Sequence, residues 1–238
     1  PLDFSDDERV VFCFNEGQTT LERRGSFSSI VLVISNHAVR ASDTARGELV
    51  VKPKSAPCAP VWAGTITMSY RRTEDLGVIT MSSTTPVAFE FDDMAPQSTF
   101  TTTYRLRSGS YTYDWLGDYT NRTPACRTRE SASGTMIPGG YLMGTPNGAY
   151  AVLTISTLFE PPTYYGSGIV LGRGTLTSNC NDNNNETTYD WTPTFNFFET
   201  AQDEVVSEDG RTLEGVHRIP EYGDGVYEYR WNLTRVDE

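Results

Sequence analysis

Histidine is scarce in this chain, which has only His37 and His217 among its 238 residues. A Ser-His-Asp triad, a Cys-His pair and a catalytic zinc site all need imidazole groups, so the sequence offers little material for them. It also lacks the Gly-x-Ser-x-Gly nucleophile elbow and the Gly-x-x-x-x-Gly-Lys phosphate loop. We therefore expect no enzyme activity and no cofactor.

Positive charge is scarce as well. The chain has 19 basic residues against 31 acidic ones, and Lys52 and Lys54 are its only lysines, so the formal net charge is −12. Such a chain repels phosphate backbones and anionic lipid surfaces, and we expect no nucleic-acid partner. No apolar run approaches the roughly 20 residues of a membrane-spanning helix, so we expect no membrane insertion.

The four cysteines, Cys13, Cys58, Cys126 and Cys180, are dispersed, and none belongs to a Cys-x-x-Cys pair that would indicate a zinc or redox site. An even, dispersed set predicts two disulfides and therefore an exported protein. The chain begins at Pro1, which we interpret as the start of a mature form whose signal peptide has been removed. We expect it outside the cell or at the cell surface. Three pairings are open, and pairing of sequence neighbours would join Cys13 to Cys58 and Cys126 to Cys180.

Asparagine residues suggest two kinds of site, acceptors for glycans and a loop that could bind calcium. Three acceptor triplets, at Asn121, Asn185 and Asn232, would carry glycans if the source organism glycosylates asparagine. The stretch from Asn181 to Glu186 offers oxygen ligands for calcium, but it lacks the Asp-x-Asp-x-Asp-Gly loop pattern. A plain solvated loop and a calcium loop both remain open there, and we expect no other metal.

Most of the sequence alternates apolar and polar residues with the period of a β-strand. The alternation is clearest in residues 62–70, 100–107 and 227–233, and it places Asn232 on a polar face. Ser108-Gly109 predicts a hairpin turn, and residues 199–208 are the one short helix candidate. Many short strands separated by turn residues predict an all-β protein, an antiparallel β-sandwich of jelly-roll or immunoglobulin-like type stapled by disulfides.

Residues 1–57 differ from the rest and predict an N-terminal β segment, followed after a proline-rich boundary by a β-sandwich over residues 58–238. One strand of this segment is apolar on both faces, so something must cover both sides of it. It is either a central strand of the protein's own sandwich or a strand donated to the next subunit of a fibre. Its residues are Ile30, Val31, Leu32, Val33 and Ile34.

Aromatic residues provide the candidates for ligand binding. Tyr111, Tyr113 and Trp115 share one face of a predicted strand, and the alternation favours a place for them in the core. Tyr164 and Tyr165 follow Pro161-Pro162 in what we interpret as a loop, and exposed rings there would stack on sugars.

Two terminal patterns carry a family resemblance. The strand that starts Trp62-Ala-Gly-Thr and the closing strand Trp231-Asn-Leu-Thr-Arg235, together with Asp209-Gly-Arg-Thr-Leu-Glu-Gly215, resemble uncharacterised secreted bacterial β-sandwich domains. Those domains open on Trp-x-Gly-Thr and close on Trp-x-Leu-x-Arg. The resemblance covers residues 60–238 and implies an extracellular β-sandwich without implying an activity.

These features predict a non-catalytic extracellular protein with a structural or adhesive role, such as a subunit of a cell-surface fibre or assembly. We expect it to self-associate edge to edge or by exchange of the 30–34 strand, because an exposed apolar strand is a liability unless assembly covers it. The alternative is a carbohydrate-binding module, with glycans as partners. A β-sandwich glycosidase with two carboxylates, for which Glu90 and Glu228 lie in predicted strands, is the remaining alternative.

Overall fold

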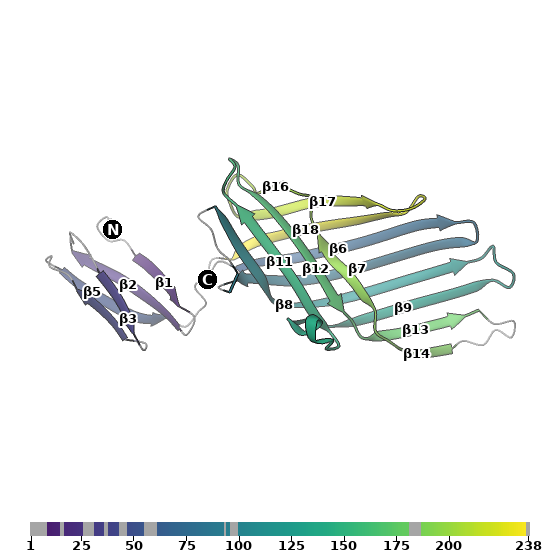
Figure 1. Ribbon diagram of the computed structural model, residues 1–238, viewed down its shortest axis with the longest axis horizontal. Helices are drawn as coiled ribbons and strands as arrows, with labels where there is room; N and C mark the ends of the chain where they lie inside the picture. Colours follow the sequence, from purple (N-terminus) through teal and green to yellow (C-terminus); the bar gives the residue numbers. More distant parts are fainter. Residues whose placement is uncertain are drawn as a thin grey trace. The chain divides into compact units, whose positions relative to one another are not determined.

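The computed structural model describes residues 9–14, 17–25, 31–35, 38–42, 47–54, 61–92, 94–95, 100–180 and 187–236 (Figure 1). The chain divides into two units, and the boundary between them follows Pro60, close to the boundary expected at residue 57. Most of the described residues are in antiparallel strands, so the predicted all-β class is confirmed. None of the helices in these ranges is long and apolar enough to cross a membrane.

The described residues of the N-terminal unit form five strands in two small sheets. Strands β1 (Arg9–Phe14), β2 (Gly17–Gly25) and β5 (Gly47–Lys54) form an antiparallel sheet with β2 in the middle. Strand β3 (Val31–Ser35) holds four of the five residues of the apolar run and pairs with β4 (Ala38–Ser42) of its own chain. Ile30, Cys58 and the side chain of Cys13 lie outside the described residues, and so does the predicted Cys13–Cys58 bond.

The second unit is built on one large antiparallel sheet of eight strands. From one edge to the other the strands are β14 (Thr187–Trp191), β13 (Gly174–Asn179), β9 (Cys126–Thr135), β8 (Thr101–Tyr119), β7 (Gly77–Phe91), β6 (Val61–Glu74), β18 (Val226–Val236) and β17 (Thr212–Pro220) (Figure 1). Threonine and serine alternate with apolar residues along these strands, and this favours a sheet with one buried and one wet face.

A smaller layer packs on the inner face of this sheet. It consists of β11 (Gly148–Ser156), β12 (Thr163–Leu171), β15 (Thr194–Glu199) and the short β16 (Glu204–Val205). The bridge β10 (Ile137–Pro138) and the single 3₁₀ turn η1 (Gly140–Met143) lead into β11. Residues 199–208 contain strand and turn, so the expected short helix is wrong.

Strand β8 joins the two layers. Its first residues pair with β11 in the small layer, at Thr101↔Ser156 through Arg105↔Val152. In the large sheet it pairs with β7 between Tyr104 and Asp118, and with β9 between Ser110 and Tyr119. The predicted hairpin turn at Ser108-Gly109 is therefore wrong. Glycine and serine mark a bulge here, because the register of β7 against β8 shifts between Ala88 and Phe89, and the strand continues through it.

The core lies between the two layers. Trp62, Ile66 and Met68 are buried on the inner face of β6, as the alternation predicts, and Tyr104 and Leu106 are buried on β8. The alternation over residues 100–107 predicts Phe100 inside as well, but it precedes β8 and is 52% exposed. Each fully buried large apolar side chain contributes about 1.5–3 kcal/mol. The small layer supplies Leu153, Tyr164, Val170, Phe195, Phe197 and Phe198.

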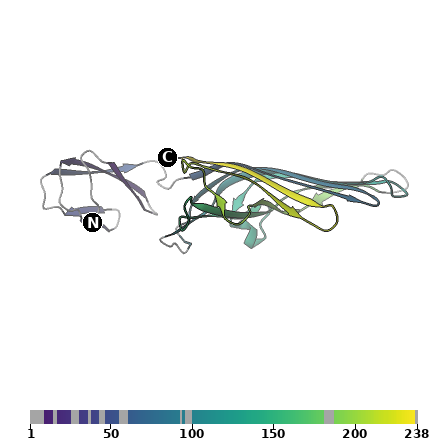
Figure 2. The same cartoon turned by 90° about the horizontal axis from the view of Figure 1, so that it is seen from above.

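The small layer covers only one end of the large sheet. Figure 2 shows the two layers stacked at that end, while the hairpins of the large sheet run on beyond the small layer. Because side chains alternate along each strand, the inner face of these extensions continues the pattern of the core. Tyr227, Met81 and Trp115 on this part are only half-buried.

A disulfide between Cys126 and Cys180 joins the start of β9 to the end of β13, two neighbouring strands. This confirms the second of the two neighbour pairings expected from the sequence. The bond closes a loop that spans 54 residues of sequence separation.

Removal of this bond by Cys126→Ala with Cys180→Ala is expected to lower the free energy of unfolding by about 4 kcal/mol, because the unfolded chain regains the entropy of the open loop. Urea denaturation of the full chain measures it. Thr128→Ala is the matched control, since its hydroxyl lies 3.6 Å from the Cys180 sulfur but closes no loop. Equal midpoints for the two proteins would show that the bond does not constrain the fold.

Candidate functional site

A groove of about 400 Å³ lies where the small layer ends on the large sheet. Its floor is the inner face of β6, β7 and β18, and one wall is the edge of β15. Met68, Met81, Tyr227 and Tyr229 form the floor, and Ile219 and Glu221 stand at the rim on the β17 side. The wall consists of Thr194, Phe195, Asn196 and Glu199, with Ile169 of β12 beside it.

The floor is strongly aromatic. Tyr70 and Tyr227 are directly paired on β6 and β18, and their rings stack with centroids 4.3 Å apart at an interplanar angle of 29°. Tyr229 continues the stack, with its centroid 6.4 Å from that of Tyr227. Burial raises the pKa of the Tyr229 phenol well above its usual range, so the ring is neutral at physiological pH. Of these rings, Tyr227 is the one that is only half-buried, so it is the ring that the groove presents to a ligand.

Carboxylates stand at both sides of the groove. The Tyr70 hydroxyl donates a hydrogen bond of 3.1 Å to Glu221 Oε2, and burial, with this carboxylate next in importance, raises the pKa of Tyr70. Glu199 contributes the second carboxylate from β15. Arg72 lies beyond Tyr70 on the same face, and its guanidinium is 5.8 Å from the ring centroid of Tyr222. The groove thus combines apolar floor and charged rim, as small-molecule sites commonly do.

The aromatic floor belongs to a longer row of residues that we call the inner-face row. Register pairs connect one residue from each of the eight strands, and directly opposed residues of antiparallel strands share a face. In spatial order the row is Ile219, Tyr227, Tyr70, Met81, Trp115, Glu130, Leu176 and Tyr189.

Glu130 is the one ionisable carboxyl in this row. It is half-buried between Trp115 and Leu176, and burial raises its pKa above the ordinary value, while a hydrogen bond from the Trp191 side chain acts in the opposite direction. Trp191 is 41% exposed and makes an edge-to-face pair with Tyr189 on β14. Strands β8 and β13 place no second carboxylate opposite Glu130, so a catalytic acid pair is not formed here.

Of the two tyrosines selected from the sequence, only one is accessible. Tyr164 is 1% exposed, so its predicted role in ligand binding is wrong. Residues 163–171 form β12 directly after Pro161-Pro162, and the alternation of this strand turns Tyr164 into the core. There its hydroxyl accepts a 2.7 Å hydrogen bond from Trp231 Nε1 and donates one to the Glu214 carbonyl, while burial raises its pKa to about 12. Tyr165 points outward and is 51% exposed, away from the groove lining.

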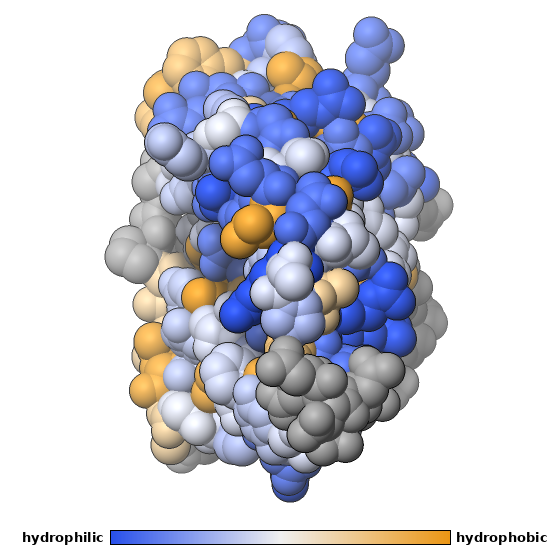
Figure 3. All heavy atoms as spheres, turned by 90° about the vertical axis from the view of Figure 1, so that its right-hand side faces the viewer, coloured by the Kyte–Doolittle hydropathy of each residue, from blue (hydrophilic) through white to orange (hydrophobic). Residues whose placement is uncertain are grey.

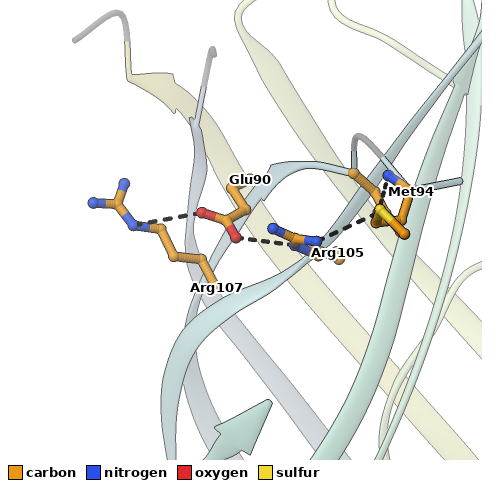
Figure 4. A network of polar contacts seen from close by, with 5 residues as sticks. Glu90, Met94, Arg105 and Arg107 are labelled. Atoms are coloured by element: carbon orange, nitrogen blue, oxygen red, sulfur yellow. Dashed lines mark hydrogen bonds and ion pairs between the residues drawn. The ribbon is translucent and has the colours of Figure 1, made fainter. Parts of the chain in front are cut away.

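Glu90 and Glu228 lie on outward positions of their strands and are ion-paired. Arg105 Nε is 3.0 Å and Arg107 Nε is 4.0 Å from the Glu90 carboxylate, which lies between the two side chains (Figure 4). Arg218 and Arg230 both contact Glu228 at 2.6 Å and lower its pKa. A glycosidase acid needs the opposite shift, so this geometry gives no support to these two residues as a catalytic pair.

Two glycan acceptors are accessible. Asn121, in the turn after β8, and Asn232, on the outer face of β18, are both exposed. Asn185 and the stretch from Asn181 to Glu186 lie outside the described residues. Within the described ranges, no group of three or more His, Cys, Asp or Glu residues is arranged to hold a metal ion.

Searches among protein families, curated proteins and solved structures found no match to this chain. The resemblance of residues 60–238 to secreted bacterial domains therefore stays a prediction. The groove and the inner-face row, neither of which could be recognised before the strands were in register, are the functional candidates. Part of the signal was present in the sequence as the inward alternation of Tyr111, Tyr113 and Trp115 and of Tyr227 and Tyr229.

The pH dependence of the stability of a Glu130 variant tests whether the inner face is half-buried at this position. Its folded pKa is raised above the unfolded value of about 4.3, so the folded chain binds more protons between the two values and loses stability as pH rises through the folded pKa. We expect Glu130→Gln to be more stable than the wild type at neutral pH, with the difference vanishing in acid. Urea denaturation at a series of pH values measures it.

Glu228→Gln is the matched control on the outer face. Because arginines lower the pKa of Glu228, its stabilisation exists above the unfolded pKa and is lost as pH falls through the folded one. This variant is therefore less stable than the wild type at neutral pH, and the difference shrinks in acid. Changes of the same sign in both variants would contradict the assignment of the two faces.

Proposed function

We propose that the β-sandwich unit is a non-catalytic, adhesive binding module of an extracellular protein, and that its groove binds carbohydrate. The observation that carries this proposal is the groove floor, where Tyr227 lines the groove together with Glu221 and is supported from beside by the stacked ring of the buried Tyr70. Sugar rings have apolar C–H faces and polar edges, and a site for them needs flat aromatic surfaces flanked by hydrogen-bonding groups.

The extracellular setting is supported by the covalent chemistry of the chain. The Cys126–Cys180 disulfide forms and persists in oxidising compartments. Exposed acceptor triplets at Asn121 and Asn232 are compatible with such a setting. The excess of acidic over basic residues in the chain disfavours anionic polymers as ligands.

A structural role in an assembly is the second candidate, and the edges of the large sheet favour it. Strand β14 is exposed along all five of its residues, and β17 forms the opposite edge. Each of these strands pairs on one side only within the described part of the chain. Open edges of this kind accept a strand from another copy. Sedimentation of the native chain over a range of concentrations distinguishes an assembling protein from a monomeric one.

The groove is tested by Tyr227→Ala, assayed by calorimetric titration with a panel of uncharged oligosaccharides. Loss of the stacking ring is expected to weaken binding by at least about tenfold, or about 1.4 kcal/mol. Tyr165→Ala is the matched control, because it removes an exposed ring of the same type outside the groove. Tyr227→Phe keeps the ring and is expected to retain binding, which separates loss of stacking from loss of folding.

Two results would overturn the proposal. If Tyr227→Ala and Tyr165→Ala bind as the wild type does, the groove is not the carbohydrate site. Glu199 and Glu221 both line the groove, so the same oligosaccharides should also be inspected for cleavage. Hydrolysis that is lost in Glu199→Gln would replace the binding module by a glycosidase.

A further inference from the structure

The inner-face row extends far beyond the groove. Neighbouring strands lie about 4.8 Å apart, so a row across eight strands measures about 34 Å. Ile219, Tyr227 and Met81 border the groove, and the row then continues through Trp115 and Glu130 to Tyr189 at the opposite edge. A ligand that fills the groove alone would leave the larger part of this row unused.

Trp115 lies in the middle of the row, between Met81 and Glu130, and its ring reaches the next residue on the same face of β8. A Cβ atom on Gly117 would be 2.7 Å from Trp115 Cη2 and 2.8 Å from Tyr119 Cε2, so both rings extend over this glycine. Gly117 follows Trp115 on the same face of β8, and any side chain there would push the rings away. The glycine thus leaves room for the edges of both rings above β8.

The far end of the row carries the most exposed aromatic pair. Tyr189 and Trp191 are 47% and 41% exposed, and their rings meet edge to face with centroids 6.5 Å apart. The Trp191 side chain also hydrogen-bonds to Glu130, so its ring is held against the row. Viewed from the end where the hairpin tips lie, the surface shows separate hydrophobic patches among hydrophilic residues (Figure 3). The described residues of the hairpin tips therefore form no continuous apolar surface of the kind found in obligate interfaces.

We infer that the inner-face row binds a linear, uncharged polysaccharide that runs across the strands, from the groove at Tyr227 over Trp115 to Trp191. This inference rests on the proposed function and specifies its ligand as a chain of several sugar units. Aromatic rings at three places provide separate stacking positions, and the carboxylates of Glu221 and Glu130 accept hydrogen bonds from sugar hydroxyls between them.

The negative charge of the row and groove favours an uncharged polymer over an anionic polymer or a second copy of the chain. The row and groove carry the carboxylates of Glu130, Glu199 and Glu221, and the chain as a whole has a net charge of −12. A second copy placed face to face would bring the same carboxylates against one another, and an anionic polymer would meet the same repulsion. An uncharged polymer meets no such repulsion.

The test compares short and long ligands on the full chain. Cellobiose and cellohexaose, with the mannan and xylan oligosaccharides of the same lengths, are titrated into the wild type, Trp191→Ala and Tyr165→Ala. The hexasaccharide of the recognised series is expected to bind at least about tenfold more tightly than its disaccharide. Trp191→Ala is expected to remove this gain and to leave disaccharide binding unchanged, while Tyr165→Ala changes neither.

Each other outcome has a separate meaning. Disaccharide binding without a gain in length, or a gain that Trp191→Ala leaves intact, overturns the extended site while the groove proposal stands. Absence of binding at every length overturns the proposed function and this inference with it. Sedimentation that shows a dimer abolished by Trp191→Ala would assign the row to a second copy of the chain. Urea denaturation of Trp191→Ala confirms that the variant is folded, since an exposed ring contributes little to the core.

Discussion

The architecture of the second unit depends on β8, the one strand among the described residues that pairs with strands of both layers. Its first residues pair with β11, and from Tyr104 onward it pairs with β7 and then with β9, so the small layer is attached at one end of the large sheet. The strands of the large sheet are longer than this cover. Their alternation nevertheless continues, because side chains of one strand cannot change faces without a bulge. An aromatic inner face therefore extends beyond the core, and the candidate site is a consequence of this mismatch between the layers.

The two faces of the large sheet differ in the kinds of side chain that they carry. On the outer face, arginine–carboxylate pairs such as Arg129–Asp114 and Arg127–Asp118 lie among threonines and serines. Exposed pairs of this kind contribute little to stability, typically up to about 1 kcal/mol each. The inner face has few such pairs and instead packs aromatic rings on glycine, as Trp231 does on Gly215 and Trp115 on Gly117. Stability is thus expected to reside in the layered end, and recognition in the extension.

Local alternation allowed much of the fold to be predicted, and tertiary context decided the rest. Most inward residues of β6 and β18 are buried as expected, because period-two patterning is a local property. Ser108-Gly109 carries the residues of a turn, but the bulge between β7 and β8 uses them within one strand. Tyr164 looked accessible because two prolines precede it, yet pairing of β12 with β11 and β15 directs it inward. The inner-face row depends on the register of eight strands, which no single segment of sequence contains.

A crystal structure of the full chain with cellohexaose, or with the hexasaccharide of whichever series binds, tests the central claim most directly. The account predicts a saccharide chain that crosses the strands, with sugar rings over Tyr227, Trp115 and Trp191 and the outer face unoccupied. An oligosaccharide bound on another surface, or a second copy of the chain packed against the inner face in its place, would contradict it.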